Sequence, residues 1–337
     1  MDKTVKKFLN AKHTSLEKKF STLYNIQCHH IQDVSDLLEH AHMHVFFDTT
    51  YACDLACAHC IYSSDSKQPL TFIPAQEISH LVNKARAEHE HVCAYALFGG
   101  EPTLAEIHNN GYFKTVADTV RNNRNGLRMA TNANWINGEH AEYLIEQIMY
   151  IYRTVSLFQF QLSVDRFHKD SVQSAIKVIK QLDKYPELEM AHSIVVRGFK
   201  FDKELEKHFT SLKTQHANIR TYFTFDLIPS GRAASLRSNT RPAPQIATDE
   251  ARAIILGDED ISGNIAFAAI NPCHMCNQFF VELHFTPDQK AFVFDRLDYT
   301  KHITDIKNPD GTYKTYKQIK RDIAKSIFAR YQNQILK

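Results

Sequence analysis

Residues 44–60 read HVFFDTTYACDLACAHC, a short apolar run of β type followed at once by three cysteines. Cys53, Cys57 and Cys60 have the spacing C-x3-C-x2-C. A tetrahedral zinc site and an ordinary cubane iron–sulfur cluster each take four protein ligands. This segment supplies three thiolates and then stops, so a metal group bound here would take its fourth ligand from elsewhere.

The composition indicates a globular chain from a reducing compartment. The 337 residues are 43% hydrophobic, which is enough for a sizeable core, and the formal net charge of +2 does not require a nucleic-acid partner. The start, MDKTVKKFLN, has no apolar signal region, and no apolar run approaches the ~18 residues of a membrane span. We therefore expect a cytoplasmic protein, in which seven cysteines indicate metal binding or catalysis before disulfides.

Segments of strand type and helix type alternate along the chain after a helical N-terminal extension over residues 1–43. The expected strands are 44–50, 92–98, 126–132, 156–164, 189–196 and 219–228. The expected helices are 74–89, 112–124, 138–150, 170–184 and 202–214. This alternation predicts parallel βαβ units, and hence a partial (β/α)6 TIM-like barrel over residues 44–233. A linker at 234–250 and a small α+β extension at 251–337, with a terminal helix, complete the predicted organisation.

Polar clusters follow each expected strand. The cysteines follow the first, GGEP (99–102) the second, TNAN (131–134) the third, and Ser163, Asp165 and His168 the fourth. Arg197 follows the fifth strand and LIPSGRA (227–233) the sixth. Parallel barrels build their active sites at the rim formed by the carboxyl ends of the strands. HAHMH (40–44) could be an array of metal ligands, but its alternation fits one polar side of a strand better.

The combination of C-x3-C-x2-C after a first strand with GGEP after a second resembles the radical S-adenosylmethionine (radical SAM) superfamily over residues 44–232. The resemblance implies that Cys53, Cys57 and Cys60 hold a [4Fe-4S] cluster whose open iron takes the amino and carboxylate groups of S-adenosylmethionine. An electron from the cluster would then cleave the sulfonium, giving methionine and a 5′-deoxyadenosyl radical that abstracts hydrogen from a substrate. A zinc ion at the three cysteines is the alternative.

The resemblance also implies a set of residues that bind S-adenosylmethionine. They are His59, Gly99, Gly100, Glu101, Pro102, Asn132, Ser163, Asp165, Arg197 and Ile228. His59 and Ile228 would lie near adenine, the GGEP segment would receive the methionine amino group, and the residues after the fourth strand would meet the ribose. Asn132 and Arg197 would meet the ribose or the methionine carboxylate, with a turn former and a surface ion pair as the respective alternatives.

Residues 271–294 read NPCHMCNQFFVELHFTPDQKAFVF and contain the pair Cys273-x2-Cys276. The segment resembles the auxiliary-cluster region of the SPASM/twitch subgroup, in which a "DG" turn and a further cysteine follow. Here the glycine is Gln289 and the later cysteine falls near Phe294. Two cysteines are too few for an ordinary cluster, so a degenerate, vestigial element is predicted. The alternatives are a redox-active pair, or a zinc or cluster site completed by His274, His284 or Cys28.

The sequence therefore predicts a radical SAM enzyme acting on a small molecule in natural-product or cofactor biosynthesis. One alternative is a maturase that modifies a ribosomally synthesised peptide. A more remote alternative is a non-catalytic iron–sulfur scaffold, which would have no use for the GGEP and LSVD segments. An electron donor such as flavodoxin or ferredoxin is expected as a partner, and no membrane or nucleic acid is.

Overall fold

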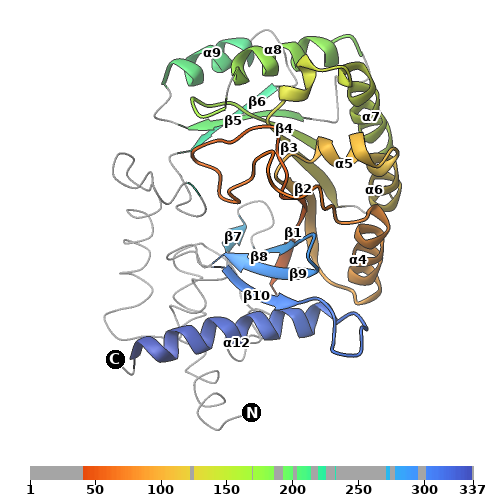
Figure 1. Ribbon diagram of the computed structural model, residues 1–337, viewed down its shortest axis with the longest axis vertical. Helices are drawn as coiled ribbons and strands as arrows, with labels where there is room; N and C mark the ends of the chain where they lie inside the picture. The colour runs from red at the N-terminus through yellow and green to blue at the C-terminus, as the bar shows by residue number, and fades with distance from the viewer. Residues whose placement is uncertain are drawn as a thin grey trace.

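The computed structural model shows one mixed sheet with helices along its outer side (Figure 1). It describes residues 41–121, 125–168, 170–185, 193–199, 203–213, 219–224, 232, 271–273, 278–294 and 301–335. The strand order is β10-β9-β8-β1-β2-β3-β4-β5-β6, and β7 pairs with β8 off this path. Strands β1 to β6 are parallel neighbours, and among the described strands the sheet is open between β6 and β10. The predicted partial barrel of six β/α units is thus confirmed as a fold class.

The strands of the barrel are β1 (His42–Thr50), β2 (Val92–Gly99), β3 (Gly126–Thr131), β4 (Phe158–Ser163), β5 (Ser193–Phe199) and β6 (Ile219–Thr224). Its helices are α4 (Ala75–Ala87), α6 (Tyr112–Val120), α7 (Ala141–Thr154), α8 (Ser171–Leu182) and α9 (Lys203–Lys213). A short helix α5 (Thr103–His108) and a 3-10 turn η1 (Asn134–Asn137), neither of them expected, follow β2 and β3. Each predicted barrel strand and helix of the described chain is present, with ends that differ by a few residues.

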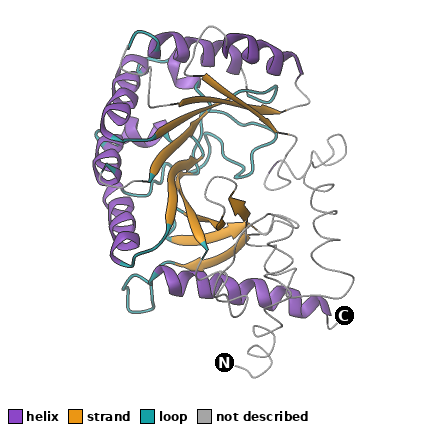
Figure 2. Cartoon of the chain, turned by 180° about the vertical axis from the view of Figure 1, so that it is seen from behind, coloured by secondary structure: helices purple, strands orange, loops and turns teal. Residues whose placement is uncertain are grey.

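The core lies between the sheet and these outer helices, which Figure 2 shows as a purple layer around the strands. In α4, for example, the buried side chains recur at helical spacing: Ala75, Ile78, Leu81, Val82 and Ala85. Along β1 the side chains alternate, so Met43, Val45 and Phe47 pack in the core. His42 and His44 alternate with these residues on β1 and lie on the other face of the strand, as predicted for the HAHMH stretch; His40 lies outside the described residues.

The C-terminal extension continues the sheet of the barrel. Strand β8 (Gln278–Phe285) pairs in parallel with β1, β7 (Asn271–Cys273) and β9 (Lys290–Phe294) pair with β8 in antiparallel fashion, and β10 (Lys301–Asp305) follows β9. Helix α12 (Tyr316–Ile335) runs beside these strands (Figure 1). Its Lys320 is 2% exposed and forms a 2.7 Å ion pair with Glu90, just before β2. The C-terminal extension is therefore joined to the barrel both by the pairing of β8 with β1 and by this ion pair.

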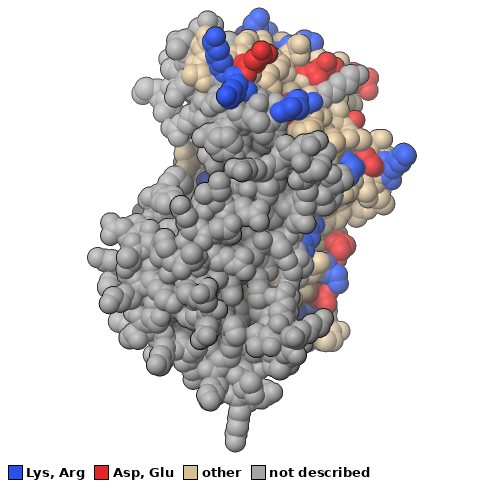
Figure 3. Space-filling model, turned by 90° about the vertical axis from the view of Figure 1, so that its left-hand side faces the viewer, with Lys and Arg blue, Asp and Glu red and all other residues tan. Residues whose placement is uncertain are grey.

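Several predictions fall on residues outside the described chain. These are most of the helical extension 1–43, the linker 234–250, Cys28, Ile228, His274 and Cys276. In the described part, none of the helices has the length and apolar character needed to cross a membrane. Basic and acidic side chains are interspersed along the described edge seen in Figure 3.

Candidate functional site

One cavity opens at the carboxyl ends of the barrel strands, and it is lined by residues from most of the predicted polar clusters. From the predicted set it contains Cys53, Cys57, His59, Cys60, Gly99, Gly100, Asn132, Ser163, Asp165 and Arg197. Glu101 and Pro102 follow these glycines but do not line the cavity, and Pro102 is the N-cap of helix α5. Side chains of β8 and β9 close the cavity on the side of the C-terminal extension.

The cysteine loop is stabilised by donors aimed at its sulfur atoms. The backbone N–H of Leu55 donates to Cys53 Sγ at 3.4 Å, and that of Ser64 donates to Cys60 Sγ at 3.3 Å. Hydrogen bonds of this kind favour the thiolate, which is the form that binds metals. Without a metal, burial and then the nearby Glu101 carboxylate hold the pKa of Cys53 above its usual range. A cationic group at this loop would therefore relieve the cost of the buried thiolate.

Arg232, which is 175 positions beyond Cys57 in the sequence, forms several contacts with the same loop. Its Nε donates to the Cys57 carbonyl at 2.9 Å, its backbone N–H donates to the Cys60 carbonyl at 3.0 Å, and its guanidinium lies 3.4 Å from Asp65. A second guanidinium nitrogen donates to the Ser64 carbonyl. The planar fork of arginine suits such multiple contacts. Arg232 lies in the LIPSGRA segment but was not among the predicted site residues.

The glycine pair is required by the contact between two loops. Gly99 has φ of 105°, and a Cβ there would lie 2.5 Å from the Thr50 carbonyl oxygen. A Cβ on Gly100 would lie 2.0 Å from the carbonyl oxygen of Ala52. Both positions exclude a side chain, because the end of β2 packs directly against the backbone that leads into Cys53. The pair thus sets the position of the cysteine loop as well as lining the cavity.

Glu101 ties the end of β2 to the end of β3. Its Oε1 accepts hydrogen bonds from the Thr103 N–H at 3.2 Å, the Thr103 hydroxyl at 2.7 Å and the Thr131 hydroxyl at 2.8 Å. Its Oε2 accepts the Asn132 N–H at 2.9 Å. The residue is 1% exposed, and burial, followed by the charge of Asp54, raises its pKa to about 7 although the hydrogen bonds oppose this. Both carboxylate oxygens of Glu101 therefore accept hydrogen bonds that join the ends of β2 and β3.

Asn132 links this network to the cysteine loop. Its side-chain amide donates to Asp54 Oδ1 at 2.7 Å and lies 3.6 Å from Cys53 Sγ, and Asn134 donates to Asp54 Oδ2 at 2.7 Å. The TNAN segment is therefore more than a turn, since two of its side chains hold the residue that follows the first cysteine. Asp54 and Asn134 were missed as site residues, although the sequence places both inside the quoted motifs.

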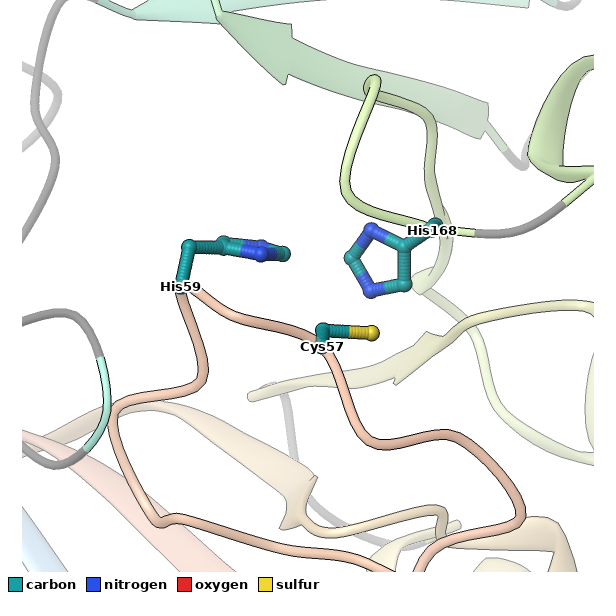
Figure 4. A group of neighbouring side chains, drawn as sticks. All are labelled: Cys57, His59 and His168. Atoms are coloured by element: carbon teal, nitrogen blue, oxygen red, sulfur yellow. The ribbon is translucent and has the colours of Figure 1, made fainter. Parts of the chain in front are cut away.

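On the opposite side of the loop, His59 and His168 meet around Asp165 (Figure 4). Asp165 Oδ2 lies 2.8 Å from His168 Nδ1 and 3.5 Å from His59 Nε2. In the described part of the chain, Cys57, His59 and His168 form the set of three whose ligand atoms all lie within 4.8 Å of one another. Figure 4 shows the Cys57 sulfur and both rings pointing toward one another. His168 was noted in the sequence but not assigned a role.

The Asp165 carboxylate raises the pKa of both histidines, but burial outweighs this effect at His59 and not at His168. Burial would lower the pKa of His168, but the hydrogen bond to Asp165 and the contact with Cys57 raise it to about 10. Burial lowers the pKa of His59 to about 4, because the more distant carboxylate compensates less. Burial alone would raise the pKa of Asp165, yet the interaction with His168 keeps it below its usual value. The shorter contact thus decides which ring holds the positive charge in the metal-free protein.

Ser163 and Arg197 are register partners on β4 and β5, and both line the cavity. Of the pair in the C-terminal segment, Cys273 lies at the end of β7 and Cys276 falls outside the described residues.

No family model matches the chain. Among curated proteins, mycofactocin maturase MftC of Mycolicibacterium smegmatis is 26% identical over 201 residues, which cover 59% of this chain and 48% of that protein. The chain thus spans about half the length of the curated relative it matches.

Solved structures with detectable similarity include two with a bound S-adenosylmethionine. The complex of anSMEcpe with AdoMet and the Cp18Cys peptide has a TM-score of 0.43 at 13% identity, covering 87% of this chain and 98% of that chain. SuiB of Streptococcus suis bound to S-adenosylmethionine has a TM-score of 0.41 at 10% identity, covering 90% and 71%.

Proposed function

We propose that this chain is a radical SAM enzyme, with Cys53, Cys57 and Cys60 as ligands of one [4Fe-4S] cluster and S-adenosylmethionine bound beside it. The observation that carries the proposal is the placement of three cysteines on one loop, against the Gly99-Gly100 end of β2, in a single cavity. The residues present fit the group, because three soft thiolates with backbone donors to two of them suit an iron–sulfur cluster. When bound, the cluster and S-adenosylmethionine supply a 5′-deoxyadenosyl radical that takes hydrogen from a substrate.

The chain's own residues would orient the cofactors and keep water away. Arg232 and the GGEP segment fix the cysteine loop from two sides, while Asp165 and His59 offer an acceptor and a ring face in the same cavity. Flavodoxin or ferredoxin would deliver the electron. A pure scaffold has no need for these further groups around a cluster.

The substrate class has two candidates. We propose a small molecule in natural-product or cofactor biosynthesis, and a ribosomally made peptide as the second candidate. The similarity to a protein named as a maturase favours the second. A short precursor-peptide gene beside this one, whose product binds the purified protein, would decide for the peptide.

Iron analysis after anaerobic reconstitution tests the proposal. Wild-type protein should hold about four irons, and Cys53→Ala, Cys57→Ala and Cys60→Ala should each lose most of them. Cys93→Ala is the matched control, because Cys93 lies on β2 and does not line the cavity. Iron that survives in all three variants would overturn the proposal.

A single zinc ion at Cys57, His59 and His168 is the competing outcome, because their ligand atoms converge. In that case Cys53→Ala would keep the metal and His168→Ala would lose it. The cluster predicts the reverse order of losses. Metal analysis of the two variants separates these readings.

We also propose that the C-terminal cysteine pair holds no second cluster. Gln289 takes the left-handed backbone conformation, with φ of 59°, in the turn where the subgroup has glycine. Phe294 packs against the rings of His284 and Phe292, at the position of the expected cysteine. The double variant Cys273→Ala/Cys276→Ala should therefore keep its iron, and a loss of about four irons would contradict this.

A further inference from the structure

A second polar group lies in the same cavity, at the seam between the barrel and the C-terminal extension. Phe46 of β1 is the register partner of His284 of β8, and both line the cavity. Asp48, the next residue on this face of β1, is completely buried. The cluster is thus built by strands more than 200 residues apart in the sequence.

The hydrogen bonds fix which ring nitrogen of His284 carries the proton. Asp48 Oδ1 accepts the Tyr62 hydroxyl at 2.9 Å and lies 3.1 Å from His284 Nδ1. An ionised carboxylate only accepts hydrogen bonds, so Nδ1 is the donor and Nε2 keeps the lone pair of the neutral ring. Tyr62 and His284, 3.3 Å apart, then both point their protons at the same oxygen.

Packing holds the ring in this orientation. The imidazole is stacked between Phe46 and Phe292, with ring centroids 4.6 Å from each and interplanar angles of 11° and 15°. Phe294 meets its edge at 5.5 Å. A ring held by two aromatic faces and one carboxylate has little freedom to flip.

The group retains capacity for a further partner. Within the described chain, the hydrogen bonds of His284 to Tyr62 and Asp48 are both made by Nδ1, and the buried Oδ2 of Asp48 receives no donor. Lys301 faces the group from β10, with its ammonium 5.2 Å from the Tyr62 ring centroid and 4.5 Å from that of Phe292. The positive charge of Lys301 interacts with the buried Asp48 carboxylate and partly offsets its charge.

We propose that His284 is an acid–base residue for the substrate and that Asp48 is its positioning residue. The proposal deepens the proposed function, since it names what the same cavity does to the substrate. A protic O–H or N–H group on the substrate transfers its proton to Nε2, and the bonding electron pair stays on the substrate oxygen or nitrogen. The resulting imidazolium is stabilised by Asp48.

The wall around His284 indicates the substrate class. Phe46, Phe98 and Phe294 give this side of the cavity an apolar lining, and Glu282 adds one acidic group. A substrate with an apolar or aromatic body and one protic group fits these surroundings. The alternative is a buried hydrogen bond that only joins β1 to β8.

Two measurements separate these roles, and neither requires a substrate or S-adenosylmethionine cleavage. Long-range proton–nitrogen NMR of histidine-labelled protein, with the His284→Gln spectrum as assignment, should show a neutral His284 ring with its proton on Nδ1. Asp48→Asn should move the proton to Nε2, because the new amide presents a donor to Nδ1. A wild-type ring with its proton on Nε2 would overturn the proposal.

Diethyl pyrocarbonate then probes whether Nε2 is reachable and basic. Peptide mapping should show His284 modified more than tenfold faster than His302, a buried histidine of β10 that does not line the cavity. Asp48→Asn should slow the reaction of His284 at least tenfold, whereas Asp288→Asn, which removes an exposed charge near Lys301, should leave it within twofold. Modification of His284 no faster than His302 would make the pair structural.

The measurements are repeated with and without a reconstituted cluster. Failure to bind iron together with the expected His284 behaviour would reject the proposed function but not the acid–base site. Iron binding with an unreactive His284 would do the reverse.

Discussion

Glu101→Gln removes a carboxylate that joins the ends of two strands while leaving its size unchanged. The amide oxygen can still take the three donors from Thr103 and Thr131 at the Oε1 position. The amide nitrogen then faces the Asn132 N–H, which donates to Oε2 in the wild type. One buried hydrogen bond is replaced by two donors that face each other.

A buried polar group left without its partner costs about 1–3 kcal/mol. A loss of about 2 kcal/mol lowers the melting temperature of a domain of roughly 200 residues by about 4–8 °C. Differential scanning calorimetry of the metal-free protein measures this. An unchanged melting temperature would show that the hydrogen bonds of Glu101 do not stabilise the folded protein.

The difference in stability between the wild type and Glu101→Gln should depend on pH, because the pKa of Glu101 is raised from an ordinary value of 4.5 to about 7. Between these values the folded protein holds a proton that the unfolded chain has lost. The stability from this proton is complete below about pH 4.5 and is lost as the pH rises through 7. Glu101→Gln should therefore destabilise the protein more at pH 5 than at pH 8.

Glu106→Gln is the matched control for the role of Glu101 in binding. Glu106 is also buried and accepts N–H groups from Gly111 at 2.9 Å and Phe113 at 2.5 Å, but unlike Glu101 it does not adjoin a residue that lines the cavity. Both variants should lose stability. If Glu101 also meets the methionine ammonium, its variant alone should bind S-adenosylmethionine about tenfold more weakly, since a charge-assisted hydrogen bond contributes about 1.5–3 kcal/mol. Equal affinities would exclude that contact.

Three further variants test the supports of the site. Gly100→Ala places a Cβ on the Ala52 carbonyl, so we expect insoluble or cluster-free protein; normal iron content would contradict the loop contact. Arg232→Gln keeps a planar donor without charge, and the reconstituted variant should lose iron to a chelator several-fold faster than the wild type. An unchanged rate would show that the contacts of Arg232 with the cysteine loop are dispensable. Lys320→Ala leaves the Glu90 carboxylate without its partner and should cost about 1–3 kcal/mol in chemical denaturation, partly restored by adding Glu90→Gln; full additivity would rule out the coupling.

The barrel could be predicted because its strands are continuous apolar runs separated by helices with a regular apolar stripe. Such patterns are local, and they also place the cysteines and GGEP at the same rim. The pairing of β8 with β1 could not be predicted, because the local sequence of a strand does not determine which distant strand it pairs with. For the same reason the contact between Asp48 and His284, which are 236 positions apart, could not be predicted from the sequence.

The roles of individual motif residues were harder to predict than their location. Gly100 was expected to contact S-adenosylmethionine. The structure shows that the absence of a side chain at Gly100 leaves room for the Ala52 carbonyl. Glu101 was expected to face the methionine amino group, and the structure places both of its oxygens in bonds to neighbouring loops. A motif fixes which residues gather at a site, while burial and partners decide which atoms remain available there.

The central claim is most directly tested by the products of S-adenosylmethionine. Anaerobically reconstituted protein with a strong reductant should form 5′-deoxyadenosine and methionine in equal amounts, and Cys57→Ala should form neither. Wild-type protein that binds zinc in place of iron, or that holds iron and yields no 5′-deoxyadenosine, would contradict the account.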